Sequence, residues 1–372
     1  MLGLFYFNRK VEMMIRLLLM MVILTQVIVP ATARAAERKL SVIRIGGAGS
    51  GGKASMIYLI GIVCARGLLE EEFKADGITI EWNPFRGAGP AVGEGIANGT
   101  LDFASYGDFP AVITRAGGIR TRFISPSYSR TNTYIAVKKD SPIKSVADLK
   151  GKKVSVGKGG NAHLAISMIL ADHGLTEKDV QLLNLAGADA DAALTAGQID
   201  AEVSGINAFK LRDLGIAKII FSTKVEHDVW KSGGQLVVGE AFAQKYPDIV
   251  QRVINVYVKA AWWASQPENR DEVIKILTRA GIPQEYYRED YEGVSFKKVY
   301  SPLFDPYVID HYKTIVAFSK ERGFIRKVFD VEEWIDRRYL EKALKANGLE
   351  DYWQPTDIHG NAAGEAGARA LP

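Results

Sequence analysis

"NGTLDFASYG" (98–107) and "AGQIDAEVSG" (196–205) follow the same pattern. Each stretch has a glycine, an aliphatic residue two positions later, then an aspartate, and it ends on a glycine. Matching residues are 98 positions apart, as Asp102 is from Asp200. A glycine followed by a short apolar run predicts a helix end and then a strand. The sequence therefore contains one helix–strand–loop unit twice.

An earlier part of each half is also repeated. "SVIRIGGAG" (41–49) and "KKVSVGKGG" (152–160) are apolar strands that end in glycines, and an apolar helix is expected after each. The matching residues, 111 positions apart, are Ile45 and Val156, Gly46 and Gly157, and Gly49 and Gly160. Strands that alternate with helices predict α/β sheets, so we expect two similar lobes. Ligands bind beyond the carboxyl ends of such strands, and the loops after these four strands are expected to face one cleft.

The stretch "IRIGGAGSGGKAS" (43–55) partly matches three functional motifs. Its glycines give the G-x-G-x-x-G of dinucleotide-binding proteins, but a chain with 36 glycines meets that pattern easily. A P-loop requires Ser or Thr directly after its lysine, and Lys53 is followed by Ala54. A nucleophile elbow begins with glycine, and that position is Ala48. None of the three motifs is complete.

The same loop is a candidate anion site without a nucleotide. Small residues allow a ligand to approach the backbone N–H groups at a helix start, where the helix dipole favours an anion. Both this loop and "GKGGNAH" (157–163) fit that arrangement. The alternative is a tight strand-to-helix turn with no ligand contact.

Residues 1–35 have the pattern of a secretory signal peptide. Basic residues precede a short apolar run from Leu17 to Val29, and Ala33 and Ala35 supply the small residues of a cleavage site. The run is shorter than the ~20 residues that a membrane-spanning helix needs, although an uncleaved anchor is the alternative. We expect an exported, periplasmic protein with no stable membrane insertion.

Charge and cysteine content exclude other classes of protein. The formal charge of the whole chain is +4, and cleavage after residue 35 removes four basic residues and one acidic residue, which leaves +1. A nucleic-acid-binding face would be strongly basic. Cys64 is the only cysteine, which rules out an internal disulfide and a zinc ribbon. The five histidines have no metal-ligating spacing, so neither a metal nor a cofactor is expected.

Longer stretches resemble a known family. "PFRGAGPAVGEGIANGTLDFASYGDFPAVITRAGG" (84–118) resembles the first-lobe signature of binding proteins for aliphatic sulfonates, taurine and nitrate. "TYIAVKKDSPIKSVADLKGKKVSVGKGGNAHLAI" (133–166) resembles their hinge strand and the opening of their second lobe. The resemblance covers nearly all of residues 40–349. It implies a two-lobed type II periplasmic binding fold of the α/β class, with two mixed lobes joined by two hinge strands. It also implies delivery of a small anionic solute to the permease and ATPase of an ABC importer.

This resemblance divides the chain into five parts. They are a signal peptide (1–35), the first lobe (36–132), the second lobe (133–238), the return to the first lobe with the C-terminal helices (239–349), and a mobile tail (350–372). The hinges are expected near Thr133 and Gln235, and a monomer is expected. Two departures concern the ligand. "SGINAF" (204–209) replaces an aromatic–acidic pair common in sulfonate binders, and Arg86 stands where an uncharged residue is usual.

The expected cleft residues follow strands or lie at the hinge. They are Gly49, Ser50, Gly51, Phe85, Arg86, Tyr106, Gly107, Asp108, Phe109, Thr131, Asn132, Gly159, Gly160, Asn161, His163, Ser204 and Asn207. Arg86 or Arg130 would attract an anionic head, and Phe85, Tyr106 or Phe109 would contact an apolar tail. Two of these residues also have a structural interpretation. Asp108 can cap a helix that starts at Pro110, and His163 can serve only as a hydrogen-bonding partner.

The expected function is solute binding rather than catalysis. The alternatives are a secreted enzyme of the same fold and a binder of thiamine precursors. Thiamine-pyrimidine synthases that resemble this family need a cysteine cluster, which a chain with one cysteine lacks.

Overall fold

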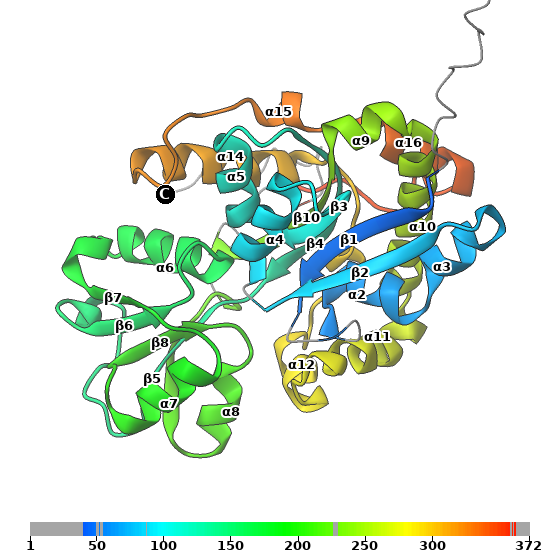
Figure 1. Cartoon of the computed structure of the whole chain (residues 1–372). Helices are drawn as coiled ribbons and strands as arrows, with labels where there is room; N and C mark the ends of the chain where they lie inside the picture. The colour runs from blue at the N-terminus through cyan, green and yellow to red at the C-terminus, as the bar shows by residue number, and fades with distance from the viewer. Residues whose placement is uncertain are drawn as a thin grey trace, which may run out of the picture. The chain divides into compact units, whose positions relative to one another are not determined.

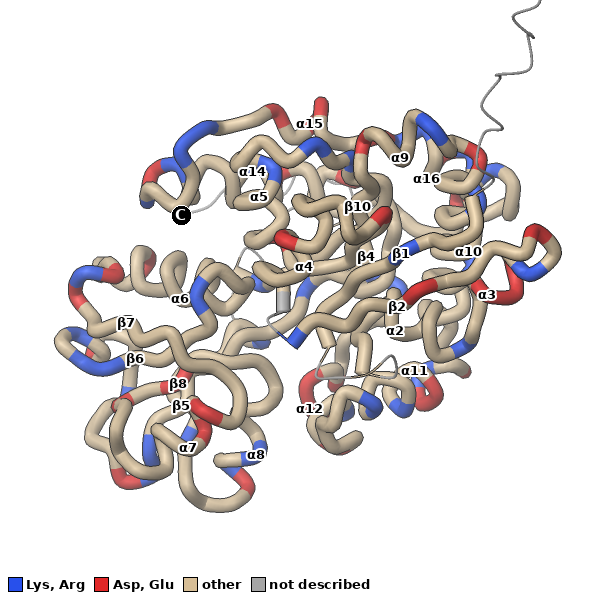
Figure 2. The backbone as a smooth tube through the Cα atoms, in the orientation of Figure 1, with Lys and Arg blue, Asp and Glu red and all other residues tan. Residues whose placement is uncertain are grey.

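A computed structural model describes residues 40–49, 52, 55–86, 88–225, 230–357, 359 and 361. The expected signal peptide lies outside the described residues, as do Ser50 and Gly51. The chain divides into two units, 1–41 and 42–372, and the second contains both sheets described below. Figure 2 shows basic and acidic residues on the helices and strands of both sheets described below.

Ten strands in the described residues form two five-stranded sheets (Figure 1). The first has the order β2-β1-β3-β10-β4, with β1 (Val42–Ala48), β2 (Thr79–Phe85), β3 (Phe103–Gly107), β4 (Thr121–Thr131) and β10 (Ser232–Gly239). The second has the order β7-β6-β8-β5-β9, with β5 (Tyr134–Lys138), β6 (Lys153–Val156), β7 (Gln181–Asn184), β8 (Ala201–Ser204) and β9 (Ala217–Ser222).

The two sheets have the same plan. In the first, β1 runs parallel to β2 and β3, and β10 runs antiparallel to β3 and β4. In the second, β6 runs parallel to β7 and β8, and β5 runs antiparallel to β8 and β9. The predicted fold class, with two mixed α/β halves, is confirmed.

The repeated aspartate has the same structural task in both sheets. The Asp102 carboxylate accepts a hydrogen bond of 2.8 Å from the backbone N–H of Arg44 in β1. The Asp200 carboxylate accepts one of 2.8 Å from the backbone N–H of Lys153 in β6. Each aspartate also donates its own N–H to the carbonyl of that same partner. The aspartate therefore fastens the start of one inner strand to the start of its neighbour.

These hydrogen bonds correct the alignment of the earlier repeat. Arg44 and Lys153 are equivalent, so the inner strands align at a spacing of 109 residues rather than the expected 111. Gly46 is then equivalent to Ser155, and Ala48 to Gly157. The glycines misled the alignment because Gly46 and Gly47 lie inside β1, whereas Gly157 lies after the end of β6.

Helices cover both faces of each sheet. Their bounds are α2 (Tyr58–Ala65), α3 (Leu68–Phe73), α4 (Ala88–Ala97), α5 (Asp108–Ala116), α6 (Asn161–Asp172), α7 (Ala188–Ala196), α8 (Ala208–Asp213), α9 (Glu240–Lys245), α10 (Pro247–Ser265), α11 (Arg270–Leu277), α12 (Gln284–Asp290), α13 (Phe296–Val299), α14 (Pro306–Glu321), α15 (Val331–Trp334) and α16 (Arg337–Asn347).

Strand alternation explains how the two faces of the first sheet are filled. A Cβ added at Gly46 would lie 2.3 Å from Leu101 Cδ1, on the face that packs against α4, α5 and α14. A Cβ at the next residue, Gly47, would instead approach Ile60 of α2. In the second sheet, α6 packs on one face, and α7 and α8 pack on the other.

The chain crosses between the sheets twice. The first crossing, at Asn132 and Thr133, lies between β4 and β5. We expected the second lobe to extend to residue 238, but β10 pairs with β3 and β4, so the return occurs between Ser222 and Ser232. The two crossings meet where Thr133 N–H donates to Thr223 Oγ1 at 2.9 Å. The location of the hinges within these segments stays a prediction.

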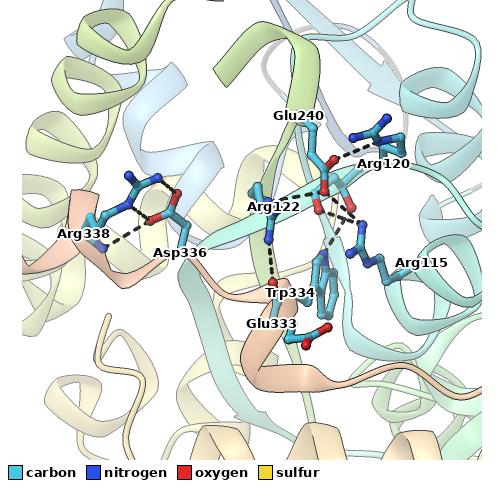
Figure 3. A network of polar contacts seen from close by, with 9 residues as sticks. Arg115, Arg120, Arg122, Glu240, Glu333, Trp334, Asp336 and Arg338 are labelled. Carbon is cyan, nitrogen blue, oxygen red and sulfur yellow. Dashed lines mark hydrogen bonds and ion pairs between the residues drawn. The ribbon is translucent and has the colours of Figure 1, made fainter. Parts of the chain in front are cut away.

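A cluster of arginines holds the C-terminal helices to the first sheet (Figure 3). The Glu240 carboxylate pairs with Arg120 at 2.9 Å and with Arg115 and Arg122 at 3.3 Å. Burial raises the pKa of Glu240, but the three arginines outweigh it and hold the pKa below its ordinary value. Arg122 also donates to the carbonyl of Glu333 in α15.

Residues 351–357, the described start of the expected mobile tail, contain two buried residues. Trp353 is 2% exposed and its Nε1 donates to Ser265 Oγ at 3.3 Å. Thr356 is also buried, and its N–H donates to the Asp305 carboxylate at 2.9 Å. Composition missed this because single tryptophan and threonine contacts leave no periodic pattern.

Candidate functional site

A cavity of about 670 Å³ lies where the two sheets and the first crossing meet. On the side of the first sheet, its lining includes Gly49 after β1 and Arg86 after β2. On the side of the second sheet, it includes the start of α7 and the loop 205–207 after β8. The segment 277–291, which contains α12, closes a further side. The lining therefore comes from segments that are far apart in the sequence.

Two helix N-termini line the cavity, one from each half. Ile57 and Tyr58 lie at the start of α2, and Gly187 and Ala188 at the start of α7. Neither helix has a side-chain cap on its first backbone N–H groups. Such an end carries about half a positive charge and favours an anion by ~0.3–1 kcal/mol, or ~2 kcal/mol when partly buried.

The charged side chains at the cavity are of both signs. Arg86 is exposed at its rim. On the second sheet's side, Lys210 of α8 pairs with Asp191 of α7 at 3.2 Å. The cavity can therefore accommodate a ligand with more than one kind of charge.

Asp290, at the end of α12, is the most buried carboxylate of the lining. It is 4% exposed, and its Oδ1 accepts hydrogen bonds from Asn132 Nδ2 at 2.9 Å and from the Tyr134 hydroxyl at 2.5 Å. Burial raises the pKa of Asp290 above its ordinary value, although these two hydrogen bonds oppose the shift. The residue lies against the first crossing, because Asn132 is part of it.

Three tyrosines, Tyr58, Tyr287 and Tyr291, form the aromatic part of the lining. Tyr58 adopts a left-handed φ of 59°, which is uncommon for a bulky residue and is a form of local strain. Its ring stacks on Tyr128 with centroids 3.7 Å apart. Burial raises the pKa of all three hydroxyls, so they stay uncharged.

Five of the residues expected in the cleft line this cavity. They are Gly49, Arg86, Thr131, Asn132 and Asn207. They come from the ends of β1, β2 and β4 and from the loop after β8. Their contact with a ligand stays a prediction.

Other expected residues lie elsewhere. Tyr106 and Phe109 belong to the apolar core of the first half, and Phe85 packs against that core. The side chains of Phe85 and Tyr106 occupy the face covered by α4 and α5, because alternate residues of a strand point to opposite faces, and Phe109 lies in α5 itself. Ser204 is at the end of β8 but does not line the cavity, although the residue after it does.

The second glycine loop is occupied by a contact within the protein. Asn161 Nδ2 donates to the Gly233 carbonyl at 2.8 Å, and Gly107 lies so close that an added Cβ would be 2.0 Å from Asn161 Oδ1. Gly159 and Gly160 precede this residue at the start of α6. The N-terminus of α6 is thus packed against β3 and β10 rather than on the cavity.

Asp108 and His163 hold parts of the fold together. Helix α5 begins at Asp108 itself, rather than at Pro110, and the carboxylate accepts from Gly233 N–H at 2.6 Å and lies 2.7 Å from His311 Nε2. His163 Nδ1 accepts from Gly159 N–H at 3.1 Å, and its Nε2 lies 2.9 Å from Glu177. Both residues are buried.

Arg130 is turned away from the cavity. Its backbone has a left-handed φ of 61°, its guanidinium lies 3.7 Å from the centre of the Tyr307 ring, and its Nη2 donates to Thr356 Oγ1 at 3.0 Å. It lines a separate hollow of about 290 Å³. A third hollow, of about 510 Å³, lies beside the Glu240 cluster, where Arg338 pairs with Asp336 at 2.7 Å.

Sequence reasoning missed the contribution of α12 and α7. Tyr287, Asp290 and Tyr291 occur in "QEYYREDY" (284–291), whose density of aromatic and acidic residues was the available indication. Asp191 lies in an alanine-rich helix that carries no such indication.

The described residues contain no cluster of three His, Cys, Asp or Glu placed to hold a metal ion. In the same residues, no helix is both long and apolar enough to cross a membrane.

Comparison with known proteins gives consistent matches. A family model described as NMT1/THI5 like matches residues 73–270, just over half of the chain. Proteins named "Putative aliphatic sulfonates-binding protein" match in Escherichia coli, at 29% identity over 81% of this chain and 88% of that protein, and in Bacillus subtilis, at 26% identity over 75% and 83%. A solved periplasmic sulfonate-binding protein from Methylobacillus flagellatus is 32% identical, with a TM-score of 0.75 over 86% of this chain and 98% of that one. The expected type II periplasmic binding fold and the resemblance to sulfonate-binding proteins are confirmed.

Proposed function

The chain belongs to the NMT1/THI5-like family, and from this premise we propose that it is an extracytoplasmic solute-binding protein. It captures a small organic anion of the sulfonate kind in the cavity between its two sheets. It then delivers this solute to the permease of an ABC importer. Export would follow from the signal peptide expected in residues 1–35.

The observation that carries this proposal is the cavity with an uncapped helix N-terminus from each half. A volume of about 670 Å³ is within the usual range of small-molecule sites, ~300–1,000 Å³. The starts of α2 and α7, with Arg86 at the rim, would bind the anionic head. The names of the relatives support a sulfonate head.

The rest of the lining suits an organic tail. Ile57 and Ile206 face the cavity from the two halves, and Leu277 and Ile282 contribute from the segment around α12. These residues, with the three tyrosines, take the place that we expected Phe85, Tyr106 and Phe109 to fill.

The cavity also favours binding over catalysis. No histidine lines it in the described part of the chain, which leaves a serine without the usual general base. Ser55 donates its hydroxyl to the Gly52 carbonyl at 2.9 Å. Cys64 is buried within α2 and does not line the cavity.

Calorimetry with butane-1-sulfonate and butylammonium tests the proposal. The sulfonate should bind and the alkylammonium should not. Gly205→Val should weaken sulfonate binding by about tenfold or more, because Gly205 lines the cavity and has room for a Cβ, the nearest atom being 4.0 Å away.

Gly239→Val is the matched control, since an added Cβ there also has its nearest neighbour at 4.0 Å but lies outside the cavity. It should bind sulfonate like the unmodified protein. Equal loss in both variants would contradict the location of the site, and binding of the alkylammonium alone would contradict the anion.

A further inference from the structure

The start of α7 carries negative charge of its own. Asp189 and Asp191 lie in the first turn of this helix, and the Asp191 side chain, which is 16% exposed, lines the cavity. A carboxylate in this place interacts favourably with the positive end of the helix dipole, and it repels a second anion. The N-terminus of α7 therefore needs a neighbouring cation before it can bind an anionic head.

Lys210 of α8 supplies that cation. Its Nζ lies 3.2 Å from Asp191 Oδ2, and its side chain is 58% exposed and lines the cavity. In the described part of the lining, only Arg86 and Lys210 are positively charged, and Arg86 belongs to the first sheet's side. Lys210 is thus the one described cation that the second sheet's side presents to the cavity.

The contact with Asp191 leaves Lys210 able to bind a further anion. A lysine ammonium group has three N–H donors, and within the described residues Lys210 gives one hydrogen bond, to Asp191 Oδ2. Asp191 Oδ1 is buried and has no hydrogen-bond partner in the same residues, so the pair is held by a single hydrogen bond. Exposed pairs of this kind contribute little to stability. Nζ can therefore turn toward a ligand at small cost, while Asp191 keeps it at the cavity wall.

We propose that Lys210 contacts the anionic head of the solute and that Asp191 positions Lys210. In the absence of solute, Asp191 holds the ammonium group at the cavity wall. When the solute binds, its anionic head competes with Asp191 for the same ammonium group. Lys210 is then a specificity-determining residue for an anion, and Asp191 limits the affinity. This inference rests on the proposed function, because it assumes that the anion binds in this cavity.

Substitutions at the two residues should act in opposite directions on the binding of butane-1-sulfonate, measured by calorimetry. Lys210→Met should weaken binding by about tenfold or more, because it removes the ammonium group and keeps an unbranched side chain of similar length. Asp191→Asn should strengthen binding by about threefold, because a neutral amide does not repel the anion and competes less for Nζ. If the pair only joined α7 to α8, both variants would lose the same contact and would weaken binding alike, which would overturn the inference.

The double variant Lys210→Met/Asp191→Asn separates direct contact from relief of repulsion. Lys210→Met alone also leaves Asp191 without its cation, and Asp191 would then repel the solute even if Lys210 never touched it. With both changes this repulsion is gone, and binding should still be about tenfold weaker than in Asp191→Asn. Equal affinity of Asp191→Asn and the double variant would show that Lys210 only neutralises Asp191, and would overturn the inference.

Lys313→Met is the matched control. Lys313 is 52% exposed, pairs with Glu332 at 3.6 Å and lies outside the cavity. This variant should bind the sulfonate like the unmodified protein, and thermal melting should show that all the variants fold. Unchanged affinity in Lys210→Met would overturn the inference and leave the proposed function standing. If the unmodified protein binds no sulfonate, the proposed function itself fails, and the inference with it.

Discussion

The two halves of the molecule share a strand plan but fill it differently. In the first sheet, the inner strands pair Gly46 with Ala104, and in the second, the equivalent positions pair Ser155 with Glu202. In the first pair, Gly46 has no side chain, and this allows the Leu101 side chain to pack closely against the strand. The second places a hydroxyl and a carboxyl in the interior, and among the described residues neither Ser155 Oγ nor Glu202 Oε2 has a hydrogen-bond partner. Equivalent positions in a repeat thus keep the backbone arrangement and not the chemistry.

The loops after the first inner strands differ in the same way. In the second half, α6 starts five residues after β6 ends, and Asn161 at its start is bound to β10. In the first half, α2 starts ten residues after β1 ends, and its N-terminus lines the cavity. In the second half, the helix N-terminus that lines the cavity is that of α7. Topological equivalence of two loops is therefore not functional equivalence.

The largest expected effect is at the repeated aspartate. Asp102→Ala removes the bond to the backbone of Arg44 and an ion pair of 2.8 Å with its half-exposed side chain, and should reduce the free energy of unfolding by about 2–3 kcal/mol. Asp200→Ala removes the bond to Lys153 and should cost about 1.5 kcal/mol. Urea denaturation measures both values. Equal losses would mean that the ion pair contributes nothing.

The next effect concerns the buried carboxyl of the second half. Burial, with the charge of Asp191, raises the pKa of Glu202 from its ordinary 4.5 to about 7. The folded state therefore holds the proton more strongly than the unfolded state. This contribution to stability is fully present below about pH 4.5 and is lost as the pH rises through about 7.

Glu202→Gln removes this dependence. Between pH 5 and pH 8 the variant should gain about 2–3 kcal/mol of unfolding free energy relative to the unmodified protein, as followed by urea denaturation at each pH. Ala104→Gln, at the equivalent position of the first sheet, is expected to lack any such pH trend. A difference between the unmodified protein and Glu202→Gln that stayed constant with pH would show that Glu202 does not titrate in this range.

The third prediction compares Gly46 and Ser155, the residues that pair with Ala104 and Glu202. Gly46→Ala should destabilise the protein by about 1–3 kcal/mol, because the new methyl group would meet Leu101. Ser155→Ala should be neutral or stabilising by up to about 1 kcal/mol, because it removes a buried hydroxyl with no partner in the described residues. Thermal unfolding distinguishes the two. A destabilising Ser155→Ala would reveal a partner for that hydroxyl, such as a buried water.

Much of the fold could be predicted from the sequence, because local patterns determine it. The spacing of Asp102 and Asp200 identified two equivalent strands, and their hydrogen bonds bear this out. Glycine was a poorer guide. Gly99 and Gly197 both adopt a left-handed φ at helix ends, whereas Gly46 is needed only for close packing inside a strand. Both uses of glycine look the same in a sequence.

The candidate site was harder to predict, because it depends on contacts between distant segments. Residues directly after strands, such as Arg86 and Asn132, could be found by rule. Asp290 and Tyr287 could not, since α12 reaches the cavity from more than 150 residues beyond the first crossing. Asn161 was expected at the ligand, but no local pattern shows that β10 lies against it.

The position of β10 has a consequence for the order in which the sheets are completed during synthesis. The strands of the second sheet, β5 to β9, are consecutive, so this sheet has all its strands by Ser222. The first sheet begins earlier but lacks the strand that joins β3 to β4 until Gly239 has been made. The half that starts first is thus the last to close. A nascent chain of this kind keeps its first half without a complete sheet until Gly239 has been made.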